Sequence, residues 1–547
     1  MPFLALLLGI VALCAIPLYL LGRSEFISYD GWWHIFIARI GNWRATFQDI
    51  RDNAHPPLFY VVLHYVAKLG HGRLLYRSAV IIPGLAAVFY IGRIGGQLFT
   101  RRALALMAAA SYGFSMAFID LSLDVRSYTL ALLFVLAATY YFFEWIRHPG
   151  GKQAPGAFLL FCSLASLGIT TEYYAFFFPL ALVVVVAIYF VRYAEFRSLM
   201  RDWVSHHWRI MGLSFLIPLF TIFTLYRRHL RYLPKEFNHV GEYYWNRHSG
   251  HLAAFLLGNL LHVLNYFSPI QFASAVTAVL VFAALAGLIC VYALAGRFSP
   301  HRMTAGIPGL VFVILICELA VAAIAGRYPF GGELRQQSIV FPFLLLGVFA
   351  LLDWILAFFP SLVTYPACAL VAIAIAVNFN YGWKRIVWTN ENSIFLASYH
   401  QFVGDFPHAP VVFTDEYSSV FYLMGTNDDR WTYVGKLGHY GLVDYQRIDE
   451  FKLTSPSGEQ QIFLRDKDDW LLRLRDPSFY PMLAHVLEDA HVKEMDLFSM
   501  VQTPSDPTQA DLAPESTIRS LASAAGLSVD HLFLKPEYSF LRVQLQR

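Results

Sequence analysis

The sequence has few charged residues for its length, and this scarcity excludes a fully soluble fold. Of its 547 residues, 57% are hydrophobic and only 14% are charged. Apolar runs of about twenty residues, which match the hydrocarbon thickness of a bilayer, recur from the N-terminus to about residue 380. After residue 382 charged residues, Pro and Ser become frequent and no such run remains. The sequence therefore predicts a polytopic α-helical membrane module over 1–381 and a hydrophilic domain over 382–547.

Cysteine and glycosylation signals are also scarce. The hydrophilic domain has no cysteine, and no Asn-x-Ser/Thr acceptor occurs anywhere, which fits a bacterial envelope protein. The net charge of +3 is too small to indicate a nucleic-acid partner. The five cysteines all lie in apolar runs and predict no disulfide framework: Cys14, Cys162, Cys290, Cys317 and Cys368.

Basic residues in short connections predict the orientation in the membrane. Arginine or lysine marks the connections at 93–102, 147–152, 192–209 and 297–302, and placing all four in the cytoplasm gives about eleven spans, plus or minus two. The hydrophilic domain is then extracytoplasmic, and the protein lies in the cell (inner) membrane. The basic connection 227–250 falls outside, against this rule, and the apolar segments 56–69 and 251–267 are short enough for interfacial or re-entrant helices. The expected spans are 2–21, 77–92, 103–120, 128–146, 157–171, 173–191, 210–226, 271–296, 305–325, 337–358 and 361–380.

The first of these segments could be mistaken for a signal peptide. Residues 2–21 lack a basic n-region and a small-x-small cleavage site. We therefore expect a retained first span.

Four outer loops carry most of the polar residues that could do chemistry. The first contains Ser-Tyr-Asp-Gly-Trp-Trp-His at 28–34 and His-Pro-Pro-Leu-Phe-Tyr at 55–60. The others contain Asp-Val-Arg-Ser-Tyr at 124–128, Thr-Glu-Tyr-Tyr at 171–174 and Tyr-Pro-Phe-Gly-Gly-Glu-Leu-Arg-Gln-Gln at 328–337. On the predicted topology all of them reach one membrane face, where a helix bundle can close the loops over one cavity.

In content and order these motifs resemble the C-type membrane glycosyltransferases, in particular the protein-O-mannosyltransferase-like family 39, which includes the lipid A aminoarabinose transferase. The resemblance covers about 25–345. It implies a polyprenyl-phosphate sugar donor, inversion at the anomeric carbon, and a first-loop aspartate, here Asp30, that acts on the acceptor. The acceptor itself is a lipid, a glycan or a protein. Gly31, Asp124 and Glu172 stand where the family often has Glu, Glu and His, which leaves a divalent metal as an open alternative.

Elementary chemistry supports the same roles. A carboxylate is a weak base in water, and partial desolvation beside Trp32 and Trp33 strengthens it, so Asp30 is the predicted catalytic base. The leaving phosphate suits an arginine fork, with Arg335 as first choice and Arg126 as second. His34 is one helical turn from Asp30 on the same face if the segment is helical. The predicted substrate-binding residues are His34, His55, Asp124, Arg126, Glu172, Tyr173 and Arg335.

Each of these residues also has a purely structural explanation. Asp30 would be a helix N-cap, His55-Pro-Pro a helix start, and Arg335 an interfacial arginine whose head reaches the lipid headgroups. Asp124 and Arg126 would pair with each other, and Glu172 would be a solvated helix end.

Two other classes of function stay open. A transporter or lipid flippase would show repeated halves with matching broken helices, which the sequence lacks, although Glu318 within a span favours this class. A membrane scaffold with the tail as a partner-binding module is the third reading. The tail is predicted as a small α/β domain with strands at 411–414, 462–465 and 541–545, a helix at 516–527, and no catalytic constellation.

Overall fold

The computed structural model describes residues 2–24, 27–39, 43–51, 55–70, 72–148, 151–232, 244–245, 251–267, 274–294, 300–331, 334–391, 411–413, 432–434, 449–454, 460–465, 474–489, 493–499, 514–534 and 539–546, and the structural statements below concern these residues. The chain divides into two compact units. The membrane unit comprises Met1–Arg23, Ile50–Val66 and Leu74–Trp388. The second unit comprises Ser24–Asp49, Ala67–Arg73 and Thr389–Arg547.

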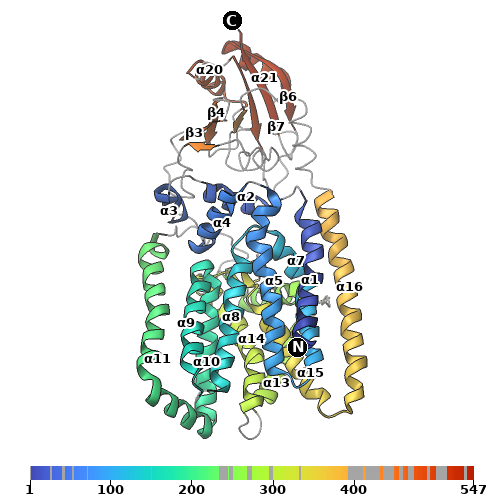
Figure 1. The fold of residues 1–547 in the computed structure, drawn as a ribbon. Helices are drawn as coiled ribbons and strands as arrows, with labels where there is room; N and C mark the ends of the chain where they lie inside the picture. The colour runs from blue at the N-terminus through green and yellow to red at the C-terminus, as the bar shows by residue number, and fades with distance from the viewer. Residues whose placement is uncertain are drawn as a thin grey trace. The chain divides into compact units, whose positions relative to one another are not determined.

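The membrane unit is a bundle of long apolar helices (Figure 1). In the described part of the chain, nine helices are long and apolar enough to cross a membrane, or ten if one bent pair forms a single span. The helices are α1 (Pro2–Gly22), α4 (Leu58–Leu69), α5 (Arg73–Leu98), α6 (Arg102–Gly113), α7 (Met116–Leu123), α8 (Tyr128–Arg147), α9 (Ala154–Thr171), α10 (Phe177–Arg192), α11 (Ala194–Arg228), α12 (Leu252–Phe267), α13 (Ala275–Leu294), α14 (Pro300–Ile324), α15 (Val340–Leu356) and α16 (Thr364–Glu391), with the 3-10 turns η1 (Tyr173–Phe176), η2 (Leu230–Tyr232), η4 (Leu334–Gln337) and η5 (Ser361–Val363).

This architecture confirms the predicted polytopic helical fold, with two local differences. The expected span 103–120 is broken into α6 and α7, which meet at a 52° bend. Ser115 causes a new helix to start there, because its side chain accepts a hydrogen bond from the Phe118 amide at 3.1 Å and so caps α7. The expected span 337–358 is the 17-residue helix α15, preceded by η4.

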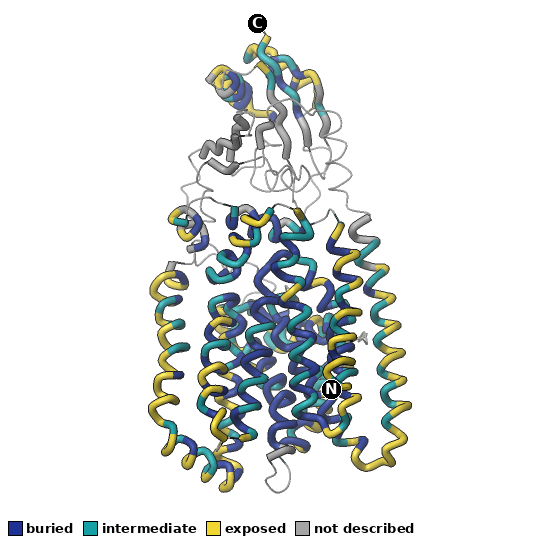
Figure 2. The backbone as a smooth tube through the Cα atoms, viewed as in Figure 1, coloured by how far each residue is buried: buried dark blue, intermediate teal, exposed yellow. Residues whose placement is uncertain are grey.

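Helices at the edge of the bundle, such as α11 and α16, are exposed along much of their length (Figure 2). Leu213 and Phe220 of α11 are 64% and 70% exposed, and Leu370 and Val377 of α16 are 69% and 65% exposed. In water so much exposed apolar surface would be unfavourable, whereas a lipid environment accommodates it. The protein is therefore a multi-pass membrane protein.

Close helix packing inside the bundle depends on small residues. Gly113 of α6 lies against Cys14 of α1, where an added Cβ would come within 2.5 Å of the cysteine sulfur. Gly347 of α15 lies against Gly309 of α14, where an added Cβ would come within 2.8 Å of its Cα. Small residues at such crossings let two backbones approach closely, as is common between membrane helices.

The second unit contains α2 (Tyr29–Arg39), α3 (Trp43–Arg51, whose last two residues belong to the membrane unit) and the C-terminal α/β region. One sheet has the strand order β1-β5-β7-β6, with β1 parallel to β5 and the other pairs antiparallel, and a second has the order β2-β3-β4. The elements are β1 (Val411–Phe413), β2 (Thr432–Val434), β3 (Asp449–Thr454), β4 (Gln460–Arg465), α20 (Phe479–Asp489), β5 (Glu494–Ser499), α21 (Glu515–Ala524), β6 (Leu527–Leu534) and β7 (Ser539–Leu545).

The predicted tail elements lie close to those observed. The helix expected over 516–527 ends earlier, at Ala524, because Gly526 adopts a positive φ of 76° and Leu527 begins β6. A small core that includes Leu483, Ile518 and Leu541 joins both helices to the sheet. The domain boundary predicted at 381/382 falls within α16, and the separate domain and its extracytoplasmic side stay predictions.

Candidate active site

Asp30 and His34 lie on α2 in the second unit. The side chain of Ser28 accepts a hydrogen bond from the Gly31 amide at 3.0 Å, so Ser28 caps this helix and the alternative role of Asp30 as its N-cap is wrong. The predicted helical spacing of Asp30 and His34 is observed. The His34 ring donates from Nδ1 to the backbone carbonyl of Asp30, at 2.6 Å.

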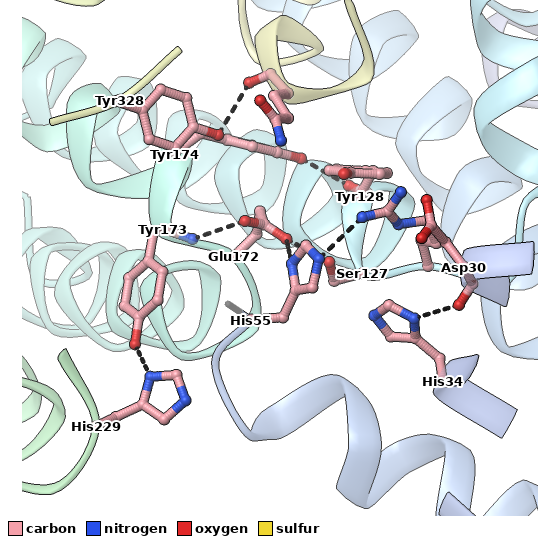
Figure 3. Close-up of polar contacts among 12 residues, drawn as sticks. Asp30, His34, His55, Ser127, Tyr128, Glu172, Tyr173, Tyr174, His229 and Tyr328 are labelled. Carbon is pink, nitrogen blue, oxygen red and sulfur yellow. Dashed lines mark hydrogen bonds and ion pairs between the residues drawn. The ribbon is translucent and has the colours of Figure 1, made fainter. Parts of the chain in front are cut away.

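In the membrane unit, three predicted residues from three separate segments form one buried cluster. His55 Nδ1 lies 2.9 Å from Glu172 Oε2, and His55 Nε2 lies 2.9 Å from an Nη2 of Arg126. Ser127 also donates its hydroxyl hydrogen to Glu172 Oε2. All four side chains are buried, and Figure 3 shows His55 beside Glu172 and Ser127. We call these four residues the relay cluster.

The hydrogen bonds fix the tautomer of His55. A guanidinium can only donate, so His55 Nε2 must accept from Arg126 and carries no hydrogen. The hydrogen is then on Nδ1, which donates to the Glu172 carboxylate. His55 is therefore a neutral imidazole that links a carboxylate to a guanidinium.

Glu172 is held in its charged form. Burial alone would raise its pKa, but the pKa is lowered because His55 and Ser127 hydrogen-bond the carboxylate and because the Arg126 guanidinium adds a favourable charge. The amide of Tyr173 also donates to Glu172 Oε1, at 3.2 Å. The Glu172 carboxylate thus stays negatively charged beside His55.

Local backbone structure places these side chains. Glu172 ends α9 in an extended conformation, which turns its side chain away from the helix axis. Arg126 follows a tight turn in which its amide bonds the Asp124 carbonyl at 2.7 Å, and its guanidinium lies 5.1 Å from the centre of the Tyr128 ring. His55 precedes Pro56 and Pro57, which direct the chain into α4.

Arg335 and Asp124 form a second contact beside this turn. Arg335 Nη1 lies 3.5 Å from Asp124 Oδ2, and the arginine side chain remains 26% exposed. The structural explanation expected Asp124 to pair with Arg126, and the structure shows its carboxylate in contact with Arg335. The structure therefore brings together six predicted residues: His55, Asp124, Arg126, Glu172, Tyr173 and Arg335.

The loop before Arg335 is fixed by Gln337. The buried Gln337 amide donates to the Pro329 carbonyl at 3.0 Å and accepts from the Gly331 amide at 3.1 Å. Gly331 has a positive φ of 82° and lies directly against Asn259 of α12. Only glycine fits this position without strain, which explains part of the motif at 328–337.

Two residues of the site were missed in the sequence. Ser127 sat inside a recognised motif but had no distinguishing spacing. His229, at the end of α11, accepts the hydroxyl hydrogen of Tyr173 at Nδ1 and lies 2.7 Å from the Ile50 carbonyl through Nε2. A lone histidine in the basic run 227–231 was its only signal.

The residues of this site do not fit a divalent metal. Among the described residues, no group of three or more His, Cys, Asp or Glu side chains is arranged to hold a metal ion. Both ring nitrogens of His55 are engaged, by Glu172 and Arg126. A metal would have to displace one of these partners, so no step of the proposed reaction uses one.

Comparison with known proteins adds to this geometry. A family model described as dolichyl-phosphate-mannose-protein mannosyltransferase matches residues 54–232, a range that contains the whole relay cluster. No match was found among curated proteins. The crystal structure of ArnT from Cupriavidus metallidurans bound to undecaprenyl phosphate shares 14% identity and a TM-score of 0.54, covering 98% of this chain and 97% of that one. The apo structure of the same protein shares 13% identity with the same coverage and TM-score.

The chain has the fold of the C-type membrane glycosyltransferase ArnT. The structural similarity extends over nearly the full length of both proteins. Together with the family match over 54–232, it confirms the resemblance predicted from the loop motifs.

Proposed function

We propose that this protein is an inverting glycosyltransferase that moves a sugar from a polyprenyl-phosphate donor to an acceptor hydroxyl at the extracytoplasmic membrane face. The observation that carries the proposal is the relay cluster, which holds an arginine at the meeting point of three motif segments. The match to a mannosyltransferase family model favours an enzyme over a transporter. The similar ArnT structure contains undecaprenyl phosphate, which supports a lipid-phosphate ligand for this chain.

The cluster suits an anionic leaving group. Arginine stays charged and can bind two phosphate oxygens through its planar fork. In the relay cluster the Glu172 charge fixes the His55 tautomer, and His55 in turn fixes one edge of the Arg126 guanidinium. We assign Arg126 and the partly exposed Arg335 to the donor phosphate. His55 and Glu172 are positioning residues, and Asp124 orients Arg335.

Asp30 is the proposed base. Its carboxylate takes the proton of the acceptor hydroxyl, and the acceptor oxygen forms a bond to the anomeric carbon of the sugar. On the opposite face the bond between that carbon and the phosphate oxygen breaks, so the configuration inverts. The electron pair leaves with polyprenyl phosphate, whose growing charge the arginines stabilise. The proton remains on Asp30 until solvent removes it.

The location follows from the same proposal. The protein lies in the cell (inner) membrane with the C-terminal domain extracytoplasmic, as the basic connections predict. The acceptor is a lipid, a glycan or a protein segment, and the C-terminal domain helps to recognise it. A reporter fused after residue 390 should therefore be active outside the cytoplasm, and cytoplasmic activity would contradict this orientation.

A panel of labelled polyprenyl-phosphate sugars tests the proposal. Purified protein in lipid nanodiscs should release free polyprenyl phosphate from at least one donor, in equal amount to the sugar transferred. The Arg126→Lys variant, which keeps the charge but loses the fork, should release it much more slowly. Movement of an intact donor across vesicle membranes, without cleavage of any donor, would instead support a flippase.

A further inference from the structure

His229 is buried in an otherwise exposed basic segment. The neighbouring Arg227, Arg228 and Arg231 are exposed, whereas His229 is only 4% exposed. Its backbone amide completes the last turn of α11 by donating to the Leu225 carbonyl at 2.8 Å. Its side chain does not cap that helix. Instead the ring joins Tyr173 to Ile50, two residues that are far from it in sequence.

The direction of each hydrogen bond follows from donor chemistry. The Ile50 carbonyl can only accept, so His229 Nε2 carries the hydrogen and donates to it across 2.7 Å. Nδ1 is then an acceptor in the neutral ring, and the Tyr173 hydroxyl donates to it. The two rings also stack, with their centres 5.8 Å apart. The His229 ring therefore donates one hydrogen bond, to Ile50, and accepts one, from Tyr173.

Tyr173 links His229 to the relay cluster. Its backbone amide donates to Glu172 Oε1, and Glu172 holds His55, which holds Arg126. Figure 3 shows Tyr173 with its ring directed to His229 and its backbone beside Glu172. Ile50 and His55 are five positions apart in the first outer loop, and each is tied to the bundle by one of these hydrogen bonds.

We propose that His229 is a positioning residue for the donor-phosphate site: it fixes the Tyr173 ring and the Ile50 carbonyl so that Glu172, His55 and Arg126 keep their alignment. This inference rests on the proposed function for its effect on donor binding. Its effect on local structure does not depend on that function.

Three substitutions separate positioning from simple packing. His229→Gln keeps one donor and one acceptor on a flexible side chain of similar length. His229→Leu keeps bulk but has neither, and Tyr173→Phe removes only the hydroxyl. Arg228→Gln, at the adjacent exposed position in the same turn, is the matched control.

The first readout is hydrogen exchange of the Tyr173 amide, which needs no substrate. We expect about tenfold faster exchange in His229→Leu and Tyr173→Phe, with near wild-type exchange in His229→Gln and Arg228→Gln. The second readout is affinity for polyprenyl phosphate, without turnover. It should fall about tenfold in the Leu and Phe variants, because a loosened Arg126 binds phosphate less well, and recover to within about threefold in the Gln variant.

The outcomes separate the two proposals. Wild-type exchange at Tyr173 in the His229→Leu variant would overturn the positioning role. Equal losses in His229→Gln and His229→Leu would also overturn it, because packing alone would then explain them. If wild-type protein does not bind polyprenyl phosphate while the exchange pattern is as expected, the proposed function fails and the positioning role stands.

Discussion

The relay cluster lies near the start of α5, and a second cluster that combines an arginine with a carboxylate, Arg101 with Asp353, lies beyond the other end of this helix. The two clusters use their hydrogen bonds differently. Arg77, near the start of α5, donates to the carbonyls of Gly22 and Leu123, just before the turn that carries Arg126. Thr100 follows the other end of this 26-residue helix, about 39 Å away along its axis. Thr100 and Arg101 both bond Asp353 there.

The cluster at Asp353 holds chain connections together. Asp353 accepts from the Thr100 amide at 2.8 Å, the Thr100 hydroxyl at 2.6 Å and Arg101 Nη1 at 3.1 Å. Arg101 in turn donates to the carbonyls of Asp353 and Leu356 and to the Thr364 hydroxyl. These bonds join the α5–α6 connection to the end of α15 and the start of α16. These contacts give Asp353 a sufficient structural role.

The relay cluster differs in what its arginine binds. Arg101 bonds backbone carbonyls and a carboxylate, which hold a chain connection in place. Arg126 bonds a neutral imidazole, and the carboxylate lies on the far side of that ring. An arginine beside a buried acid therefore does not by itself indicate a catalytic site. Side chains from several motif segments, converging on one guanidinium, are the more informative sign.

Removing the Asp353 carboxylate should have the largest effect on stability. Asp353→Ala leaves the Thr100 amide and hydroxyl without their acceptor and removes the carboxylate partner of Arg101, and breaking such a partly buried pair costs about 3 kcal/mol. Unfolding in detergent should show this loss, while the folded fraction keeps a near-normal transfer rate. Full stability with lost transfer would reverse the roles of the two clusters.

Removing the Glu172 charge from the relay cluster should instead affect the transfer rate more than the stability. Glu172→Gln removes the negative charge that, through His55, holds the Arg126 guanidinium in place, so Arg126 loses its alignment and transfer should fall about 100-fold, as small misplacements of binding groups can cause. Steady-state kinetics with the active donor measures it. Glu144→Gln, at a glutamate that bonds Gln97 near the far end of α5, is the control and should keep activity within about twofold.

The lowered pKa of Glu172 predicts how acid acts on the relay cluster. A carboxyl whose pKa is lower in the folded state stabilises the protein above its unfolded pKa, about 4.3, and loses that contribution as pH falls through the folded pKa. The stability of wild type relative to Glu172→Gln should therefore be constant from pH 7 to pH 5 and decline below about pH 4. A relative stability that rises on acidification would exclude a charged Glu172.

The smallest effect is expected at the cap of α2. Ser28→Ala removes the side-chain bond to the Gly31 amide and should cost about 1 kcal/mol of stability. Transfer by the folded enzyme should remain close to wild type. A large loss of transfer in Ser28→Ala would mean that helix placement, not the Asp30 carboxylate, limits the reaction.

The sequence predicted the elements better than their contacts. Apolar runs located the spans because hydropathy is a local property, and the order of the loop motifs indicated the fold family. The break at Ser115 was missed because the apolar run continues through it. The pairing of Asp124 with Arg335, 211 positions away, and of Tyr173 with His229, 56 positions away, depends on tertiary packing that local patterns do not encode.

The most direct test of the account is single-turnover transfer by Asp30→Asn. Ser28 caps α2, so the substitution leaves the cap intact, and the variant should insert, fold and bind donor like wild type. An amide cannot accept the hydroxyl proton, and positioned bases contribute about 10²–10⁴-fold in rate. We predict a loss of at least about 100-fold in sugar transfer and in release of polyprenyl phosphate, with donor affinity unchanged. A loss smaller than about threefold would contradict the account, because Asp30 would then take no part in proton transfer.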